Sequence, residues 1–364
     1  MKRIILTGGG TGGHTYPLVE IAKKLQKNSR VKILYVGSHS GPEEKITRDA
    51  KIPFKAILVG KRRNYYSLDN FFDLFKIIIG LVQARILFYR FRPNLVLAKG
   101  GYVTVPIIFW AKQFKVPLII HESDIVMGRT NLWAAKYANK ICLGFPLKYF
   151  SMHNLDSLRR AKTKIPLENL IYTGTPIRGE FFSTASVHKN NPPKILFTGG
   201  SQGASKINDL VAEILSELVK KYEIYHICGN KDFPYLSKRF KNEKRYHLYD
   251  FSQSMPELLK NSDLIITRSG ANILSEISAL GKPSILIPLR NSSKDHQRVN
   301  AKLYQDSNSA IMLSENNLTS SSLLSIINRL MEDDQLRKLL GHHAQEFSVR
   351  NSAAIITDLI YELI

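Results

Sequence analysis

The chain has 364 residues, more than the roughly 100 to 200 of a typical domain, and its length therefore predicts two domains. Hydrophobic residues make up 44% and charged residues 23%, an ordinary globular balance that excludes a disordered protein. The formal net charge is +22; residues 1–160 hold 27 Lys and Arg against 9 Asp and Glu, whereas residues 161–364 hold 25 against 21. A generally lysine-rich proteome would explain the total but not the asymmetry, which favours anionic partners: nucleic acid, anionic lipid or diphosphate.

Targeting and membrane-spanning segments are not expected. The basic residues Lys2 and Arg3 lead into an apolar run, 4–6, that is far too short for a signal-peptide core, so we expect the chain to stay in the cytoplasm. The longest apolar candidate, 71–91, contains four charged residues and is not expected to cross a bilayer. Cys142 and Cys228 stand alone in strand-like contexts, which predicts buried free thiols rather than a disulfide or a metal site.

Short apolar runs of strand length alternate with helix-length segments along the chain. They lie at 3–7, 31–36, 54–59, 95–98, 118–121 and 140–143, and again at 194–198, 224–228, 246–249, 264–267, 284–288 and 310–313. Unbroken apolar strands separated by helices are typical of parallel sheets covered on both faces. The sequence therefore predicts two α/β domains of similar design.

Each predicted domain opens with a strand that runs into glycines, at 4–9 and at 195–200. The segment 174–178, followed by the polar stretch 183–193, is expected to be the crossover between the domains. Ligands of open α/β sheets bind beyond the carboxyl ends of the strands. We therefore expect both glycine loops to face one cleft between the domains.

The first glycine loop, Gly8 to His14, contains Thr11, Gly12 and Gly13 and precedes a helix, where backbone N–H groups can bind a phosphate. A dinucleotide fold would place an acid near the end of the second strand, but that strand ends at Ser38 without one. This absence argues against a nicotinamide or flavin cofactor. His14 follows the glycines and is placed for proton transfer or phosphate contact, although a lone histidine is more often structural.

The second domain offers polar groups at three strand ends. Its glycine loop, 199–204, includes Ser201, Gln202 and Gly203 and could bind another phosphate. Arg268 follows the strand 264–267, and Glu276 lies on the next helix, where its carboxylate could accept both hydroxyls of a ribose. A polar cluster at 295–301, with His296 and Gln297, could bind sugar hydroxyls. The sequence thus predicts a nucleotide-sugar site that needs no metal.

Taken together, these motifs resemble the MurG family, the peptidoglycan transferases that add N-acetylglucosamine (GlcNAc) to undecaprenyl-diphospho-N-acetylmuramoyl-pentapeptide. The resemblance runs in order along essentially the whole chain. It rests on residues 8–14, 99–102, 121–122, Asn131, 174–178, 199–204, 268–271, Glu276, 296–297 and 300–301. Each motif alone is weak, but their common order makes a chance match implausible.

The resemblance implies an inverting, metal-independent and cofactor-free transferase of GT-B architecture, with two Rossmann-like parallel-sheet domains facing a cleft. Residues 1–177, with a last helix at 351–364 that packs back onto them, would bind the undecaprenyl-diphosphate-linked acceptor. Residues 178–350 would bind UDP-GlcNAc. The reaction would transfer GlcNAc to the C4 hydroxyl of N-acetylmuramic acid, converting lipid I to lipid II. The enzyme would lie peripherally at the cytoplasmic face of the bacterial inner membrane and contact its anionic lipids.

The motif match also assigns roles to residues. Those on donor-binding positions are Arg178, Ser201, Gln202, Gly203, Arg268, Glu276, His296 and Gln297, together with Asn131 from the first domain. His14, Tyr102 and Glu122 fall on positions linked to the acceptor or to the chemistry. The chain departs from the family at Ser123-Asp124, where many members carry Gln-Asn, and at Met127, where Pro is common. Asp124 adds a carboxylate and is a second candidate for the base.

Three other functions are compatible with parts of the pattern. A glycosyldiacylglycerol synthase would use a UDP-hexose on the same scaffold, and a UDP-GlcNAc 2-epimerase would need no acceptor. A nucleic-acid-binding module would need basic residues interleaved with stacking aromatics, of which 90–92 is only a weak hint, so no nucleic acid is expected.

A basic and aromatic run, 61–66, precedes Phe71, Phe72, Phe75 and the apolar run 77–79. This order suits the headgroup boundary of a membrane, where interfacial helices lie. The alternative is a helix that faces the core and follows a solvated cationic loop.

Overall fold

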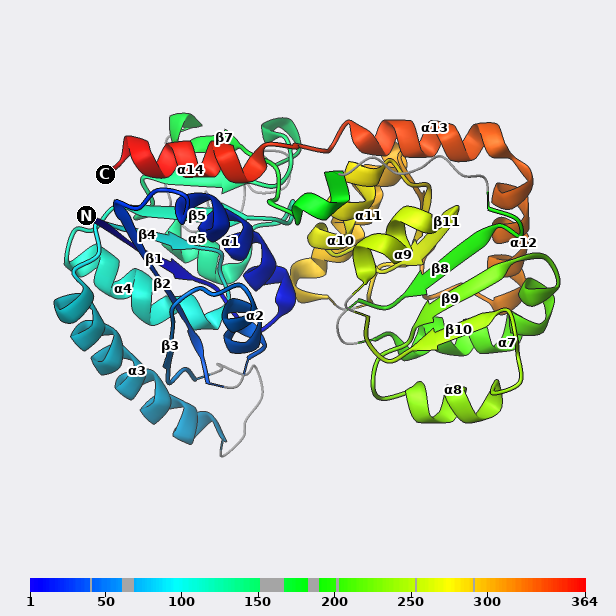
Figure 1. Cartoon of the computed structure of the whole chain (residues 1–364), viewed down its shortest axis with the longest axis horizontal. Helices are drawn as coiled ribbons and strands as arrows, with labels where there is room; N and C mark the ends of the chain where they lie inside the picture. Colours follow the sequence, from blue (N-terminus) through cyan, green and yellow to red (C-terminus); the bar gives the residue numbers. More distant parts are fainter. Residues whose placement is uncertain are drawn as a thin grey trace. The chain divides into compact units, whose positions relative to one another are not determined.

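The computed structural model describes residues 1–39, 41–60, 69–150, 167–182, 190–200, 203–252, 254–290 and 292–364. The chain divides into two compact units. Unit 1 comprises Met1–Arg178 and Asn351–Ile364, and unit 2 comprises Gly179–Arg350. Each unit is a parallel sheet with helices around it (Figure 1). The predicted fold class, two Rossmann-like α/β domains, is therefore confirmed.

The sheet of unit 1 has the strand order β3-β2-β1-β4-β5-β6-β7, and its paired strands run parallel. The strands are β1 (Lys2–Thr7), β2 (Val31–Ser38), β3 (Phe54–Ile57), β4 (Leu95–Ala98), β5 (Leu118–Glu122), β6 (Lys140–Leu143) and β7 (Leu170–Tyr172). The sequence predicted all but β7. That strand has three residues, of which Leu170 alone is buried, so it lacks the apolar run by which the others were found.

Helices cover both faces of this sheet. They are α1 (Gly12–Leu25), α2 (Glu43–Asp49), α3 (Asp69–Phe91), α4 (Val105–Gln113), α5 (Arg129–Ala134) and α14 (Ser352–Glu362), with 3-10 turns η1 (Tyr102–Thr104) and η2 (Leu167–Asn169). Successive strand residues point to opposite faces. Ile5 accordingly lies in a core with α3 and α4, and Ile4 lies in a second core with α1 and α14. The last helix thus completes the core of unit 1.

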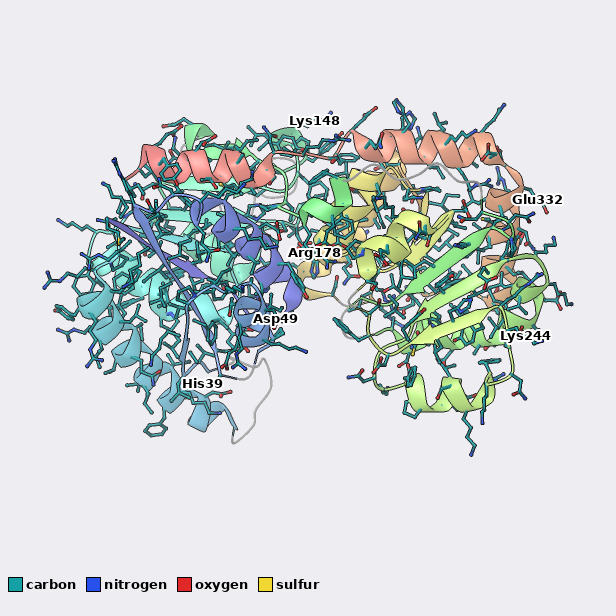
Figure 2. All side chains as sticks on the ribbon, viewed as in Figure 1. His39, Asp49, Lys148, Arg178, Lys244 and Glu332 are labelled. Carbon is teal, nitrogen blue, oxygen red and sulfur yellow. The ribbon has the colours of Figure 1, made fainter. Side chains whose placement is uncertain are left out.

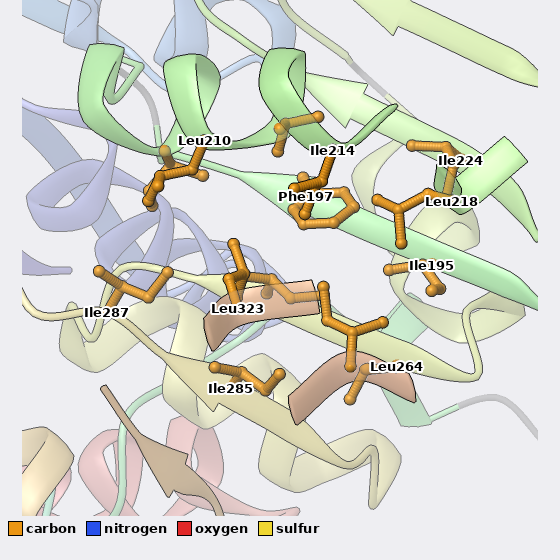
Figure 3. Close-up of a cluster of buried hydrophobic side chains, with 14 of the residues drawn as sticks. Ile195, Phe197, Leu210, Ile214, Leu218, Ile224, Leu264, Ile285, Ile287 and Leu323 are labelled. Carbon is orange, nitrogen blue, oxygen red and sulfur yellow. The ribbon is translucent and has the colours of Figure 1, made fainter. Parts of the chain in front are cut away.

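The sheet of unit 2 has the order β10-β9-β8-β11-β12-β13, again with parallel pairs. Its strands are β8 (Lys194–Thr198), β9 (Glu223–Ile227), β10 (Tyr246–Tyr249), β11 (Leu264–Thr267), β12 (Ser284–Leu286) and β13 (Ile311–Met312), and all six were predicted. Its helices are α7 (Ser205–Lys221), α8 (Phe233–Arg239), α9 (Met255–Asn261), α10 (Ala271–Leu280), α11 (His296–Asp306), α12 (Ser320–Glu332) and α13 (Asp334–Gln345), with η3 (Gly179–Phe182) and η4 (Ser293–Asp295). Figure 3 shows Phe197 of β8 packed among aliphatic side chains of α7 and α12.

In both sheets, the strand order reverses at the first strand of the unit. β1 lies between β2 and β4, and β8 lies between β9 and β11, so the connections leave the two sides of the central strand toward opposite edges. The loops at the carboxyl ends of these strands diverge and leave backbone groups open to a ligand. This reversal sets the position of the motif loops in each unit.

Two further expectations can be compared with the structure. Cys142 and Cys228 are buried free thiols, as predicted. Among the described residues, no helix has both the length and the hydropathy needed to cross a membrane.

The packing of α14 on α1 generates a stability prediction. Ile356 of α14 is fully buried, so Ile356→Ala should leave a cavity that costs about 2 to 5 kcal/mol and lowers the melting temperature by several degrees. Ile355→Ala, at the half-buried neighbour, is the matched control and should cost less. Differential scanning calorimetry of the full chain measures both; equal losses would show that α14 does not contribute a specific core contact.

Candidate functional site

The glycine loop of unit 1 connects β1 to α1. Gly10 has a φ of +87°, a conformation that glycine adopts without strain, and the buried Tyr35 hydroxyl donates to the Gly8 carbonyl at 2.7 Å. Thr11, the N-cap of α1, makes no side-chain capping bond. The first N–H groups of α1 are therefore not capped by this side chain, and N–H groups at such a position can donate hydrogen bonds to a ligand oxygen.

His14 lies in the first turn of α1 and is half-buried. Its Nδ1 is 3.0 Å from the Gly9 carbonyl oxygen and 3.3 Å from Thr11 Oγ1. Because a carbonyl can only accept, Nδ1 carries the proton and the Nε2 lone pair is left to accept another. Burial lowers the pKa of His14, and the positive charge of Lys99 lowers it further. His14 is thus prepared as a neutral proton acceptor.

A buried carboxylate that the sequence analysis did not identify supports this loop. Glu43, at the start of α2, accepts hydrogen bonds from the Ser38 N–H at 2.9 Å and the Ser38 hydroxyl at 2.6 Å, and from the Gly10 N–H at 3.4 Å. A Cβ on Gly9 would overlap the Glu43 carboxylate. Glu43 is thus an acid shortly after the end of β2, where a dinucleotide fold would have one. Its carboxylate is bound to Ser38 and the glycine loop, so it cannot reach a ribose.

Glu122, the last residue of β5, holds the next loop rather than facing solvent. Its carboxylate accepts from the backbone N–H groups of Asp124 at 3.2 Å and Gly128 at 2.9 Å, and from Asn131 Nδ2 at 2.9 Å. Asn131 also donates to the His121 carbonyl at 3.1 Å. Both side chains are buried, which makes them supports of residues 123–128. Burial and the charge of Asp124 raise the pKa of Glu122.

Asn131 has one further property that bears on its predicted donor contact. Its Oδ1 is buried, has no hydrogen-bond partner among the described residues, and lies close to where a Cβ on Gly100 would stand. Gly100 has a φ of +86°. The sequence singled out Asn131, but in unit 1 it is an interior residue, so its contact with the donor stays a prediction.

Tyr102 and Asp124 complete the set predicted for unit 1. The Tyr102 ring packs against Gly10, since a Cβ on that glycine would be 3.3 Å from Tyr102 Cε1. A Cβ on Gly101 would be 3.6 Å from His14 Nδ1. Asp124 is half-buried, and its charge raises the pKa of His14. The loops after β1, β4 and β5 therefore converge on His14.

Unit 2 presents a matching edge at β8 and β11, which pair directly. α7 and α10 begin there with Ala204 and Gly270 as N-caps, and neither makes a side-chain capping bond. A Cβ on Gly270 would meet nothing within 4 Å, whereas one on Gly203, whose φ is +75°, would overlap the Cys228 carbonyl. Two helix N-termini thus follow the carboxyl ends of neighbouring strands, an arrangement suited to a diphosphate. Ser201 and Gln202 lie outside the described residues.

The guanidinium of Arg268 has hydrogen-bond and ion-pair partners within unit 2, which the sequence did not indicate. It is buried; its Nη1 donates to the carbonyls of Ile287 at 3.0 Å and Pro288 at 3.3 Å, and its Nη2 is 2.7 Å from Glu315 Oε1. These contacts tie the ends of β11, β12 and β13 together. Glu315 was not predicted, because it follows a two-residue strand and belongs to no motif. A direct contact of Arg268 with the donor stays a prediction.

In the polar cluster of α11, a backbone hydrogen bond fixes the orientation of the Gln297 side-chain amide. Gln297 Oε1 accepts from the Leu289 N–H at 2.9 Å, which leaves its NH2 group for a ligand. The Ser269 hydroxyl donates to the Gln297 carbonyl at 2.8 Å. His296 and Glu276 are both half-buried, Glu276 in the middle of α10. Among the described residues, no group of three or more His, Cys, Asp or Glu could hold a metal ion.

Arg178, labelled in Figure 2, belongs to unit 1. Its guanidinium carbon is 5.4 Å from the ring centroid of Tyr16 on α1, within the range of a cation–π contact. The structure therefore brings Arg178 next to the glycine loop of unit 1, and its predicted contact with the donor is not tested by these contacts.

Comparison with known proteins agrees with this arrangement. Residues 4–143 match the glycosyltransferase family 28 N-terminal domain, and residues 194–356 match the family 28 C-terminal domain. The chain is 36% identical over 369 residues to the UDP-N-acetylglucosamine–N-acetylmuramyl-(pentapeptide) pyrophosphoryl-undecaprenol N-acetylglucosamine transferase of Clostridium botulinum (strain Langeland), with 99% of both chains covered. The enzyme of the same name from Clostridium tetani is 35% identical, over 99% of this chain and 97% of its own.

Solved structures give the same picture. MurG of Acinetobacter baumannii has a TM-score of 0.77 at 25% identity, over 100% of both chains. UDP-GlcNAc 2-epimerase of Neisseria meningitidis, solved with UDP-GlcNAc, has a TM-score of 0.67 at 15% identity over 100% of both chains, which shows a shared fold alone. The chain belongs to glycosyltransferase family 28, among its UDP-N-acetylglucosamine–N-acetylmuramyl-(pentapeptide) pyrophosphoryl-undecaprenol N-acetylglucosamine transferases.

Proposed function

We propose that the chain transfers GlcNAc from UDP-GlcNAc to the C4 hydroxyl of N-acetylmuramic acid in undecaprenyl-diphospho-MurNAc-pentapeptide, with inversion and without a metal. The observation that carries this proposal is the 36% identity over 99% of both chains to a relative named for that transfer. The test is transfer of radiolabelled GlcNAc to the lipid-linked acceptor, with UDP-glucose and a diacylglycerol acceptor as comparisons. Transfer to diacylglycerol instead, or UDP-GlcNAc turnover without any acceptor, would contradict it.

Unit 2 is the proposed donor site. The N-termini of α7 and α10 supply N–H donors and positive dipole ends for the UDP diphosphate, which gains charge as the glycosidic bond breaks. Glu276 accepts the ribose hydroxyls, and the Gln297 NH2 group binds the sugar. These groups replace the metal ion that many sugar transfers use to neutralise the leaving diphosphate.

Unit 1 is the proposed acceptor site, with His14 as the general base. Nδ1 is held by the Gly9 carbonyl, so Nε2 takes the proton of the incoming hydroxyl as its oxygen attacks the anomeric carbon. The lowered pKa of His14 keeps the ring unprotonated at neutral pH. Thr11, Gly12 and Gly13 position the acceptor from the start of α1. Asp124 is the alternative base.

His14→Ala should lower kcat by at least about a hundredfold, with little change in UDP affinity, because a general base contributes on that scale. Asp124→Asn separates the two candidate bases, since it removes a charge without changing shape. Steady-state kinetics on the full chain measures both variants. An inactive Asp124→Asn with an active His14→Ala would assign the base to Asp124.

Glu276→Ala should weaken UDP-GlcNAc binding by roughly tenfold to a hundredfold, the cost of about 1.5 to 3 kcal/mol for a hydrogen bond to a charged group. Lipid binding in unit 1 should not change. Glu257→Ala, at an exposed acid of α9 in the same unit, is the matched control. Calorimetry that finds the same UDP affinity in folded Glu276→Ala as in Glu257→Ala would remove the ribose assignment.

We also propose that unit 1 docks on anionic lipids of the inner membrane at its cytoplasmic face, through α3. One face of this helix packs in the core through Ala84, Leu87 and Phe88. Its other face carries six apolar side chains that are 45% to 56% exposed: Phe75, Ile78, Ile79, Val82, Ile86 and Tyr89. A continuous exposed apolar stripe on a basic unit suits an interfacial helix. The basic run 61–66 lies outside the described residues, as do the side chains of Phe71 and Phe72.

Ile79→Glu combined with Ile86→Glu should reduce sedimentation with anionic liposomes by at least about tenfold, because each buried isoleucine contributes about 1.5 to 3 kcal/mol. Changing Lys61, Arg62 and Arg63 to Ser should weaken binding about a hundredfold, at about 1 kcal/mol for each charge, and high salt should act likewise. Leu339→Glu, at an exposed leucine of α13, is the control. Unchanged sedimentation of the α3 variant would move the membrane face elsewhere.

A further inference from the structure

Lys99 is a buried cation that the proposed mechanism does not use. It follows β4 directly, and its backbone N–H donates to the Thr7 carbonyl at 2.9 Å. Only 3% of its surface is exposed. Its Nζ is 2.9 Å from His121 Nδ1 and donates to the Ser123 hydroxyl. Burying an ammonium is costly, so it persists only where neighbouring groups compensate its charge.

The hydrogen bonds show which partner carries the charge. His121 Nε2 lies 2.9 Å from the Gly174 carbonyl and must donate to it, so Nδ1 accepts from Lys99. Burial and the charge of Lys99 hold the pKa of His121 well below its usual value. Burial also raises the pKa of the neighbouring Cys142 thiol to about 12. Both are uncharged at neutral pH, and the positive charge resides on Lys99.

Two carboxylates balance this charge. Burial lowers the pKa of Lys99 to about 8, while the negative charges of Glu122 and Asp124 act in the opposite direction. Lys99 therefore remains mostly protonated at pH 7. Glu122 holds residues 123–128 in shape, and Ser123 of that segment binds Lys99 directly. Lys99, Glu122 and Asp124 therefore form one charged network around residues 123–128.

Lys99 also lies next to His14, since a Cβ on Gly8 would be 3.3 Å from Lys99 Cβ and 3.1 Å from the His14 carbonyl oxygen. Besides burial, the charged groups of the described residues that act on His14 are Lys99 directly after β4, Asp124 from the loop after β5 and Glu43 from α2. Lys99 opposes protonation of the imidazole, and the two carboxylates favour it. Without Lys99, the charged groups among the described residues that act on His14 would be the two carboxylates.

We propose that Lys99 is a positioning residue of the acceptor site, whose ammonium balances Glu122 and Asp124 and keeps His14 in its uncharged, proton-accepting form. The second part rests on the proposed function, in which His14 is the base. A purely structural lysine would join β4 to β5 through His121 and Ser123 without changing the charge state of His14. The two roles differ in what happens when the charge alone is removed.

The direct test is an NMR titration of the His14 ring in the full chain, assigned with His14→Gln, and it needs no substrate. Lys99→Met removes the charge at similar length and should shift the His14 titration to higher pH. Lys99→Arg keeps the charge, so His14 in this variant should titrate close to His14 of the parent protein. Lys282→Met, at a half-buried lysine of unit 2, is the control and should leave His14 unchanged. The proposal is overturned if the midpoint of the His14 titration in Lys99→Met lies at the same pH as in the parent protein or at a lower one.

Kinetics separates this proposal from the proposed function. In Lys99→Met, the acid limb of kcat/KM should move to higher pH, and kcat/KM below neutral pH should fall at least about tenfold, while KM for UDP-GlcNAc stays constant. A shifted His14 titration with an unmoved acid limb would support the charge balance and exclude His14 as the base. If Lys99→Met does not fold, adding Asp124→Asn should restore folding, because one acid leaves with the cation; failure to restore it overturns the charge balance.

Discussion

The function of both units depends on the reversal of strand order at β1 and at β8. A parallel strand inside a sheet has its backbone groups paired on both sides, but the residues that follow it leave the sheet with N–H groups that need partners. At a reversal, neighbouring connections move apart, so these groups are not covered by the next helix. The motif loops therefore occupy the places where the fold itself leaves polar backbone exposed.

The loops of unit 1 are held by two buried acids. Glu43 binds Ser38 and the glycine loop, and Glu122 binds the segment after β5. A buried carboxylate that accepts two or three hydrogen bonds fixes several backbone groups at once, and its removal would leave each of them unsatisfied. This division explains why the candidates for proton transfer, His14 and Asp124, are only half-buried while the supporting acids are buried.

Much of this could be predicted from the sequence, because apolar runs mark buried strands and glycine runs mark the loops that follow. The missed features depend on contacts between distant residues. Glu43 starts a short helix that belongs to no motif, and only the fold brings its carboxylate to Gly10. Arg268 was identified by its motif, but its ion pair with Glu315 spans 47 positions. Asn131 was found as a motif residue, whereas its burial against Gly100 depends on two left-handed glycines after β4.

The two glycine loops look alike in sequence but differ in the charge around them. In unit 1, Glu43 lies behind the loop and accepts a hydrogen bond from the Gly10 N–H, and the charges of Glu43 and Asp124 both act on His14. In unit 2, a Cβ on Gly200 or Gly270 would meet no described atom within 4 Å, and Arg268 lies beside them, paired with Glu315. Anions prefer helix N-termini without a neighbouring carboxylate. The turn in unit 2 thus suits the leaving diphosphate of the donor, whereas the turn in unit 1 lies beside the proposed base.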